Sequence, residues 1–303
     1  MSERWPNLRA LELFVAVVDE GSVGAGARKV GIAQPNASRL VAELELSAGT
    51  ALVNRSPRGS TPTATGLLFA EQSRAVLNSA RQFNDWMRDA GSTEAPELKI
   101  GASMTIAEHL LPAWLTGLRR RVGPVRVDLR VLNSAQVLEE VRNGSLQVGF
   151  VETPHVPDRL NSMVVQQDEL VVVVAPGHEW SGRAGGVSLE ELSQTALVVR
   201  EQGSGTREAL QEILAGLHPV EPLQVLGSNA AVRVAVASGA GPAVLSRLAL
   251  AGQLASGELV SVPLQDPQAR RPLTAVWQGP RRLTGAAAEL VAVAAQPNSP
   301  NPA

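Results

Sequence analysis

Apolar positions follow two different patterns along the chain. In the first ninety residues they recur every three or four positions, which is the period of an amphipathic helix. From Glu97 onward, short runs of aliphatic residues alternate with stretches of helical period. The first pattern predicts a helical region, and the second predicts α/β units with largely parallel sheets.

Two short helices joined by a tight turn are expected early in the chain. Ser22 is a suitable N-cap for a helix over Val23–Val30, and Gly31 can adopt the conformation that the following turn needs. A second helix opens at Gln34-Pro35, where proline loses no hydrogen bond because first-turn amides are unpaired in any helix. The apolar face of this helix consists of Ala37, Leu40, Val41, Leu44 and Ala48. The layout is that of a helix-turn-helix, a motif that reads DNA.

The opposite face of the second helix is polar, with Gln34, Asn36, Ser38 and Arg39 on its first two turns. Such side chains can reach base edges or phosphates when a helix lies in a major groove. The alternative is an ordinary solvated helix face. The polar segment 54–63, with Arg55 and Arg58 among turn-forming residues, favours DNA, because it suits a wing that contacts phosphates beside the reading helix.

The charge of the chain argues against a general nucleic-acid binder. Its formal net charge is −2, and residues 1–62 carry seven basic and six acidic side chains, a net +1. Electrostatic affinity for DNA must therefore come from where the basic residues lie. Arg28, Lys29, Arg39, Arg55 and Arg58 are placed around the turn, the second helix and the wing. A modest charge per chain also favours binding as an oligomer.

One long helix is predicted from Ala64 to about Asp89. Its apolar and small residues recur at alternating spacings of four and three, at Phe69, Ser73, Val76, Ala80, Phe83 and Met87. This spacing favours a heptad-like seam between two chains. The alternative is a helix that packs on its own domain. The tract 90–96, with Gly91 and Pro96, is expected to end the helix as a hinge.

The remainder of the chain alternates between strands and helices. Strands are predicted at 98–102, 125–131, 147–151, 170–175, 196–200, 223–226, 243–246, 259–262 and 273–277, and helices at 106–121, 134–143, 188–193, 206–217 and 230–237. Four junctions between a strand and a helix carry small hydroxyl or amide residues, namely 103–105, 133–134, 203–206 and 228–229. Free amides at helix starts favour an anion, although each junction alone could be an ordinary helix cap.

The N-terminal residues resemble a known family. The run LELFVAVVDEGSVGAGARKVGIAQPNASRLVAELELSAGTALVNRSPRGSTPTATG is similar, without a gap, to the DNA-binding domain of LysR-type transcriptional regulators. The shared features include Gln34-Pro35-Asn36-x-Ser38-Arg39, Leu44-Glu45, Gly49, Leu52, Arg55 and Thr63-x-x-Gly66. Gly26, Ala33 and Val53 depart from the usual alanine, serine and phenylalanine. Gly26, like Gly24, should weaken its helix by about 1 kcal/mol relative to alanine.

The resemblance implies a domain plan for nearly the whole chain. A winged helix-turn-helix domain is expected at 1–62, a dimerising linker helix and hinge at 63–92, and a two-lobed α/β effector domain of the periplasmic-binding-protein type at 93–296. Two crossing strands would join lobe I, at 93–165 and 268–296, to lobe II, at 166–267. The last residues, 297–303, are proline-rich and expected to be disordered.

The resemblance also implies partners and site residues. The DNA contacts would come from Gln34, Pro35, Asn36, Ser38, Arg39, Arg55 and Arg58. The contacts to a small effector, which we expect to be anionic, would come from Ser103, Thr105, Ser134, Arg200, Ser204, Thr206 and Asn229. The expected partners are operator DNA, the effector and a second copy of the chain in a homodimer or homotetramer. The resemblance leaves RNA polymerase open as a further partner.

Other classes of protein find little support. The four histidines lack metal-ligand spacing, no phosphate-loop or nucleophile-elbow motif is present, and Glu152 shows no catalytic partner in the sequence, so neither an enzyme nor a cofactor is expected. No apolar run is long enough for a membrane span, and cysteine is absent, which fits the cytoplasm. The alternative function is a small-molecule binding protein of the solute-binding kind that does not read DNA.

Overall fold

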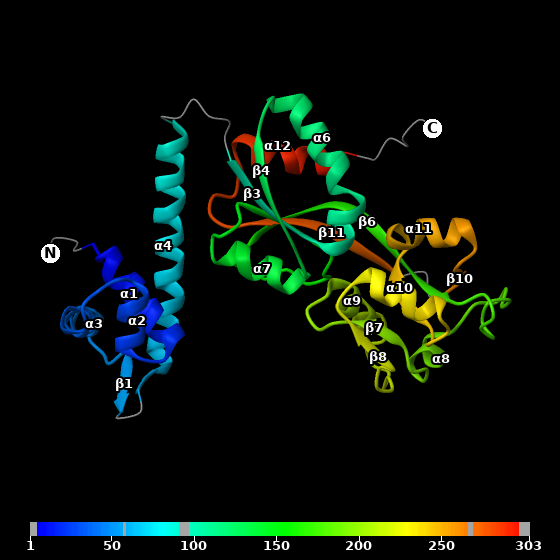
Figure 1. The fold of residues 1–303 in the computed structure, drawn as a ribbon, viewed down its shortest axis with the longest axis horizontal. Helices are drawn as coiled ribbons and strands as arrows, with labels where there is room; N and C mark the ends of the chain where they lie inside the picture. Colours follow the sequence, from blue (N-terminus) through cyan, green and yellow to red (C-terminus); the bar gives the residue numbers. More distant parts are fainter. Residues whose placement is uncertain (1–4, 57–58, 91–96, 266–268, 297–303) are drawn as a thin grey trace. The chain divides into compact units, whose positions relative to one another are not determined.

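The computed structural model describes residues 5–56, 59–90, 97–265 and 269–296. The chain divides into two compact units, Met1–Glu94 and Ala95–Ala303 (Figure 1). The predicted hinge residues 91–96, the predicted disordered tail 297–303 and Arg58 lie outside the described residues.

The first unit is helical with a small hairpin. Its elements are α1 (Leu8–Glu20), α2 (Val23–Lys29), α3 (Gln34–Ala48), β1 (Val53–Ser56), β2 (Gly59–Pro62) and α4 (Ala64–Ala90). The local signals act as expected: the Ser22 hydroxyl accepts a hydrogen bond from the Ala25 amide, and Gly31 has a positive φ of 66°. Strands β1 and β2 pair antiparallel and form the wing.

The glycines of α2 have different surroundings. A Cβ built on Gly26 would lie 2.7 Å from the backbone nitrogen of Val17 in α1, whereas one built on Gly24 would have no neighbour closer than 3.8 Å. Gly26 therefore allows α1 and α2 to pack closely, and its low helix propensity is the cost of that contact. Helix propensity alone therefore describes Gly24 but is incomplete for Gly26.

We expect opposite results when each of these glycines is replaced by alanine. Gly24→Ala should stabilise the unit by about 1 kcal/mol, because alanine is the better helix former. Gly26→Ala should destabilise it by about 1–3 kcal/mol, because the added methyl group meets backbone atoms of Val17. Urea unfolding of both variants measures the difference. Equal effects of the two substitutions would contradict the packing argument.

Helix α4 has two different halves. In its first half, Phe69 packs edge-to-face against Phe14 with ring centroids 5.3 Å apart, and Ser73 is buried. From its middle onward, Val76, Phe83 and Met87 are 41%, 57% and 47% exposed. The start of the predicted seam therefore packs on its own unit, as the alternative proposed, whereas the later seam residues Val76, Phe83 and Met87 are exposed.

The second unit contains a nine-stranded mixed sheet in the described residues. The strand order is β4-β3-β5-β11-β6-β9-β7-β8, with β10 paired to β6. Strands β3 (Glu97–Ser103), β4 (Arg126–Leu132) and β5 (Val148–Val151) are parallel and form lobe I. Strands β7 (Val198–Arg200), β8 (Gln224–Leu226) and β9 (Ala243–Ser246) are parallel and form lobe II.

Two long antiparallel strands connect the lobes. Strand β6 (Asn161–Val174) runs from lobe I into lobe II, and β11 (Arg270–Trp277) returns beside it (Figure 1). The short strand β10 (Val260–Val262) pairs with the far end of β6. Parallel pairing was predicted for most of the sheet, and the connecting strands are the antiparallel exception.

The helices lie against these strands. They are α5 (Met104–His109), α6 (Leu111–Val122), α7 (Ser134–Arg142), α8 (Leu189–Ser193), α9 (Gly205–Ile213), α10 (Asn229–Ala237), α11 (Arg247–Ser256) and α12 (Gly285–Ala294). The single helix predicted at 106–121 is wrong, since it is divided at Leu110, two residues before Pro112. Helices α11 and α12 were not predicted.

Candidate DNA-reading face and effector site

Helix α3 presents its predicted polar face to solvent. Gln34, Pro35, Asn36 and Arg39 are exposed and Ser38 is half-buried, whereas Ala37, Val41 and Leu44 are buried against the other helices. The Arg39 side chain is 71% exposed, and its Nε lies 3.7 Å from Glu43 Oε1, one turn along the same helix. A pair this exposed is weak, so the guanidinium remains available to a phosphate or a base.

The wing is held at both of its ends. The Ser60 amide of β2 donates a 3.0 Å hydrogen bond to the Gly21 carbonyl at the end of α1. At the start of β1, the Leu52 and Val53 amides both donate to Oε1 of Glu45, at 2.9 and 3.1 Å. Arg55 lies in β1, but its side chain is not among the described atoms. Arg58 lies outside the described residues.

Lys29 makes a smaller contribution to the basic surface than the sequence suggested. Its Nζ donates a 2.7 Å hydrogen bond to Oε1 of Glu20 in α1. This hydrogen bond and the nearby carboxylate raise the pKa of Lys29 above its usual value. The charge is therefore retained but already partnered.

All seven predicted effector residues are buried in the second unit. Ser103 and Thr105 belong to the junction of β3 and α5, and Ser134 begins α7, so these three come from lobe I. Lobe II supplies Arg200 at the end of β7, Ser204 and Thr206 at the start of α9, and Asn229 at the start of α10. The four junctions therefore meet where the two lobes face each other.

Direct contacts join these residues across the lobes. The Asn229 side-chain amide donates a 3.2 Å hydrogen bond to the Thr105 hydroxyl, and the Arg200 guanidinium donates to the Asn229 carbonyl oxygen. The Ala135 amide of lobe I donates a 3.0 Å hydrogen bond to the Gly203 carbonyl of lobe II. Polar groups of both lobes therefore pair with one another in this arrangement.

Two groups in the same region have no hydrogen-bond partner among the described atoms. These are the buried hydroxyls of Ser103 and Ser204. Ser204 also precedes α9, whose first turn lacks a side-chain cap. Buried hydroxyls are almost always hydrogen-bonded, so these two are exceptions within the described residues.

Arg200 already has a carboxylate beside it. Its Nε and Nη2 donate to the two carboxylate oxygens of Glu201, at 2.8 and 3.0 Å. The Arg200 side chain is 1% exposed and that of Glu201 is 28% exposed. The Arg200 charge is therefore already paired with a carboxylate in this arrangement.

The sequence missed two charged residues next to this region, Arg271 and Asp168, and the partner of a third, Glu152. Arg271 of β11 contacts Asp168 of β6, Glu152 and the predicted site residue Thr206, and all four are buried. Glu152, for which no partner could be identified, accepts a hydrogen bond from Arg271. No local pattern could reveal these contacts, because the partners lie far apart in the chain.

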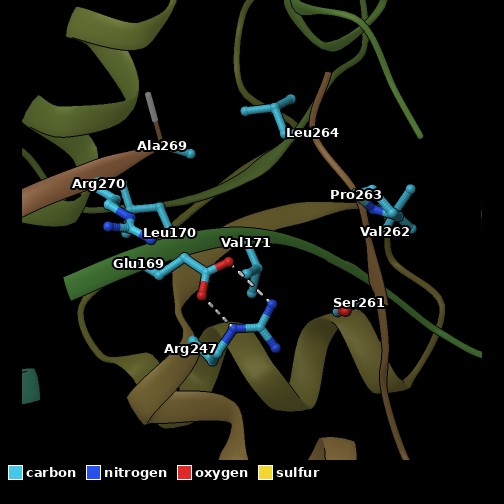
Figure 2. Close-up of a pocket in the computed structure, with 10 residues that line it drawn as sticks. All are labelled: Glu169, Leu170, Val171, Arg247, Ser261, Val262, Pro263, Leu264, Ala269 and Arg270. Carbon is cyan, nitrogen blue, oxygen red and sulfur yellow. Dashed lines mark hydrogen bonds and ion pairs between the residues drawn. The ribbon is translucent and has the colours of Figure 1, made fainter. Parts of the chain in front are cut away.

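A separate cavity of about 320 Å³ is lined largely by residues of lobe II (Figure 2). Its lining includes Glu169 of β6, Arg247 of α11 and Arg270 of β11, together with residues of β10. Arg247 makes a bidentate ion pair with Glu169, which lowers the pKa of Glu169 and raises that of Arg247. Both side chains are half exposed, so the pair is weak, and none of the seven predicted residues lines this cavity.

Comparison with known proteins covers both units. Residues 8–67 match the family described as "Bacterial regulatory helix-turn-helix protein, lysR family", and residues 91–297 match the "LysR substrate binding domain". The chain belongs to the LysR family. It is a DNA-binding transcriptional regulator with an effector-binding domain, and not an enzyme. Regulators of this type bind operator DNA and small-molecule effectors and form oligomers.

Individual relatives agree with this assignment. The uncharacterized HTH-type transcriptional regulator Rv2282c of Mycobacterium tuberculosis is 41% identical over 291 residues, 93% of each chain. The regulator CysL of Bacillus subtilis is 32% identical over 87% of this chain and 88% of its own. The structures of ArgP from Mycobacterium tuberculosis and of CbnR with its target DNA share the fold, with TM-scores of 0.67 and 0.61 at 16% and 21% identity. They cover 96% and 95% of this chain, and 98% of each of those chains.

These findings decide between the two functions that the sequence left open. The relatives matched over both units are transcriptional regulators, so a solute-binding protein without DNA reading is excluded. No described helix is long and apolar enough to cross a membrane. Among the described residues, no group of three or more histidine, aspartate or glutamate side chains could hold a metal ion.

Proposed function

We propose that this regulator reads its operator with the exposed face of α3 and with the wing. Gln34, Asn36, Ser38 and Arg39 would contact bases or phosphates, with Pro35 fixing the start of the helix and Arg55 and Arg58 contacting the adjacent backbone. The observation that carries the proposal is the exposed Arg39 on a helix whose opposite face is buried. Its target lies on DNA, so we place the protein in the cytoplasm.

We further propose that a small oxyanion, such as a carboxylate, phosphate or sulfate group, binds between the lobes. The uncapped start of α9, the two unpartnered hydroxyls and the Arg200 guanidinium support an anion there. Ser103, Thr105, Ser134, Ser204, Thr206 and Asn229 would supply the remaining polar contacts. An effector shifts the balance between two lobe arrangements only by its different affinity for each of them.

We assign pairing between chains to α4 from its middle onward. Val76, Phe83 and Met87 are exposed there, and burying apolar side chains in a second copy would remove them from water. A homodimer formed in this way brings two reading helices to one operator, and two dimers would give a tetramer. Analytical ultracentrifugation of the Phe83→Glu variant should show dissociation to smaller species. An unchanged sedimentation profile would exclude this seam.

The DNA-reading proposal is tested by selecting genomic fragments with the full-length protein. The Arg39→Ala variant should lose about 10- to 100-fold in affinity for the selected site, the range expected for one base or phosphate contact. Arg119→Ala, which removes an exposed arginine from α6 of the other unit, is the matched control and should bind normally. If Arg39→Ala binds as tightly as this control, α3 does not read the operator in the proposed way.

The effector proposal is tested by calorimetry on the full-length protein. Sulfate, phosphate and short carboxylates serve as probes, and each should bind more weakly to Arg200→Met and Ser204→Ala than to the wild type. Arg247→Met removes an arginine from the separate cavity and should leave binding unchanged. The proposal fails if only neutral ligands bind, or if the Arg247 variant loses affinity instead.

A further inference from the structure

Arg271 occupies the point where the two lobes and both connecting strands meet. Its Nε donates a 2.8 Å hydrogen bond to Oδ2 of Asp168, its neighbour across the strand pair, and its Nη1 donates a 2.9 Å bond to the Thr206 hydroxyl of α9. Its Nη2 donates to Oε2 of Glu152, at the end of β5. One guanidinium thus contacts lobe I, a connecting strand and lobe II.

The burial of this cluster makes its contacts costly to break. The Arg271 side chain is 1% exposed, and those of Glu152 and Asp168 are 2% and 1% exposed. The second carboxylate oxygen of Asp168 accepts a 2.8 Å hydrogen bond from Ser246. A buried charge that loses its partner keeps the cost of desolvation without the attraction that offset it. The lobes therefore cannot separate by a small movement without either breaking the cluster or admitting water.

The cluster also borders the predicted effector residues. Thr206 is one of them, and the Glu152 amide donates a 3.3 Å hydrogen bond to the Ser134 hydroxyl, which is another. A Cβ built on Gly205, beside Thr206, would lie 2.6 Å from the carbonyl carbon of Glu152. Any ligand that moves the first turn of α9 away from lobe I would therefore pull Thr206 away from Arg271.

We propose that Arg271 is a positioning residue of the effector site. It holds the first turn of α9 against lobe I, and its contacts with Asp168, Glu152 and Thr206 must break for the lobes to part. The role in effector response rests on the function proposed above. Holding the lobes is a property of the protein alone. The arrangement with the cluster intact and the arrangement with the cluster broken are the two states that an effector would bind with different affinity.

The same strand pair provides a matched control. Next to Arg271 and Asp168, the pair Arg270 and Glu169 faces the opposite side, where Glu169 is paired with Arg247 (Figure 2). Arg247→Met and Arg271→Met thus each remove an arginine that is paired with a carboxylate of β6. The Arg247 pair is half exposed and lies within lobe II and the connecting strand, so it does not join the lobes.

The experiment measures the distance between the lobes directly. The chain has no cysteine, so a spin label can be placed on each lobe through Arg120→Cys and Gln211→Cys, both at exposed positions. Labelled full-length protein is diluted with unlabelled protein, so that distances within one chain dominate. The wild type should give one narrow distribution by pulsed electron paramagnetic resonance. In Arg271→Met a second distance should gain about tenfold or more in population, whereas Arg247→Met should match the wild type.

A further variant separates positioning from stability. Arg271→Met combined with Glu152→Gln and Asp168→Asn removes all of the charges in the cluster, so its melting temperature should return toward that of the wild type. Its second distance should nevertheless persist, because the three-way contact is absent. A folded Arg271→Met variant with the wild-type distribution would overturn the proposal, and so would a triple variant whose distribution returns to that of the wild type. Neither measurement uses DNA or effector, so failure of the proposed function would be recognised separately.

Discussion

Replacing Gly66 by alanine is expected to destabilise the first unit by about 3 kcal/mol, at the upper end of the usual cost of overpacking. Gly66 lies in the first turn of α4, and a Cβ built on it would be 2.0 Å from the carbonyl oxygen of Leu52. That oxygen also accepts a hydrogen bond from the Thr63 amide, which fixes it at the base of the β1–β2 hairpin. Backbone, and not the end of a flexible side chain, would have to move.

Chemical unfolding of Gly66→Ala measures this effect. Gly252→Ala in α11 is the control, since a Cβ there would meet nothing within 4 Å and alanine should stabilise that helix by about 1 kcal/mol. The close approach also explains the Thr63-x-x-Gly66 pattern, because the Gly66 amide donates a 2.9 Å hydrogen bond to the Thr63 hydroxyl. If Gly66→Ala were as stable as the wild type, the junction of wing and α4 would have to be looser than described.

Replacing Glu45 by alanine is expected to weaken operator binding, although the substitution removes a negative charge from the DNA-reading unit. Simple electrostatics predicts the opposite, since one acid fewer should favour a polyanion. One Glu45 oxygen, however, accepts the amides of both Leu52 and Val53, which are buried at the start of the wing. Leaving those amides without a partner should cost about 2–3 kcal/mol of stability and release the wing from the end of α3.

The matched control for this prediction is Glu43→Ala, because Glu43 is an exposed acid of the same helix and is paired with Arg39. That variant should bind the operator at least as tightly as the wild type, since it frees Arg39. Fluorescence anisotropy at several salt concentrations compares the two variants. Stronger binding by Glu45→Ala than by Glu43→Ala would show that the acid acts through its charge alone.

The sequence predicted those features that local signals determine. The start of α3 follows from Pro35 and from the spacing of its apolar residues, and the wing follows from turn formers around the two arginines. Each signal lies within a few residues of the structure that it specifies. The positions of the seven candidate effector residues came from the same kind of signal, hydroxyls and amides at helix starts, together with the family resemblance.

The features that the sequence did not reveal depend on distant contacts or on weak periodicity. Helix α12 is rich in alanine and apolar on most of its surface, so it has no clear polar side to indicate a helix. The first half of β6 mixes polar residues with the exposed Met163 and Val164, so only its buried, continuously aliphatic end resembled a strand. Arg271 and Glu152 are 119 positions apart, and nothing near either residue indicates the other.

The antiparallel pairing of β6 with β11 has a consequence for the design of hybrid regulators. The chain enters lobe II along β6 and leaves it along the neighbouring strand, with Glu169 opposite Arg270. Lobe II is therefore an insertion whose two ends are adjacent, and such insertions can be exchanged with little change to the host. If lobe II were replaced by the corresponding segment of another LysR-type regulator, joined at these two positions, half of the effector-binding domain would be exchanged. The sheet of lobe I would remain continuous.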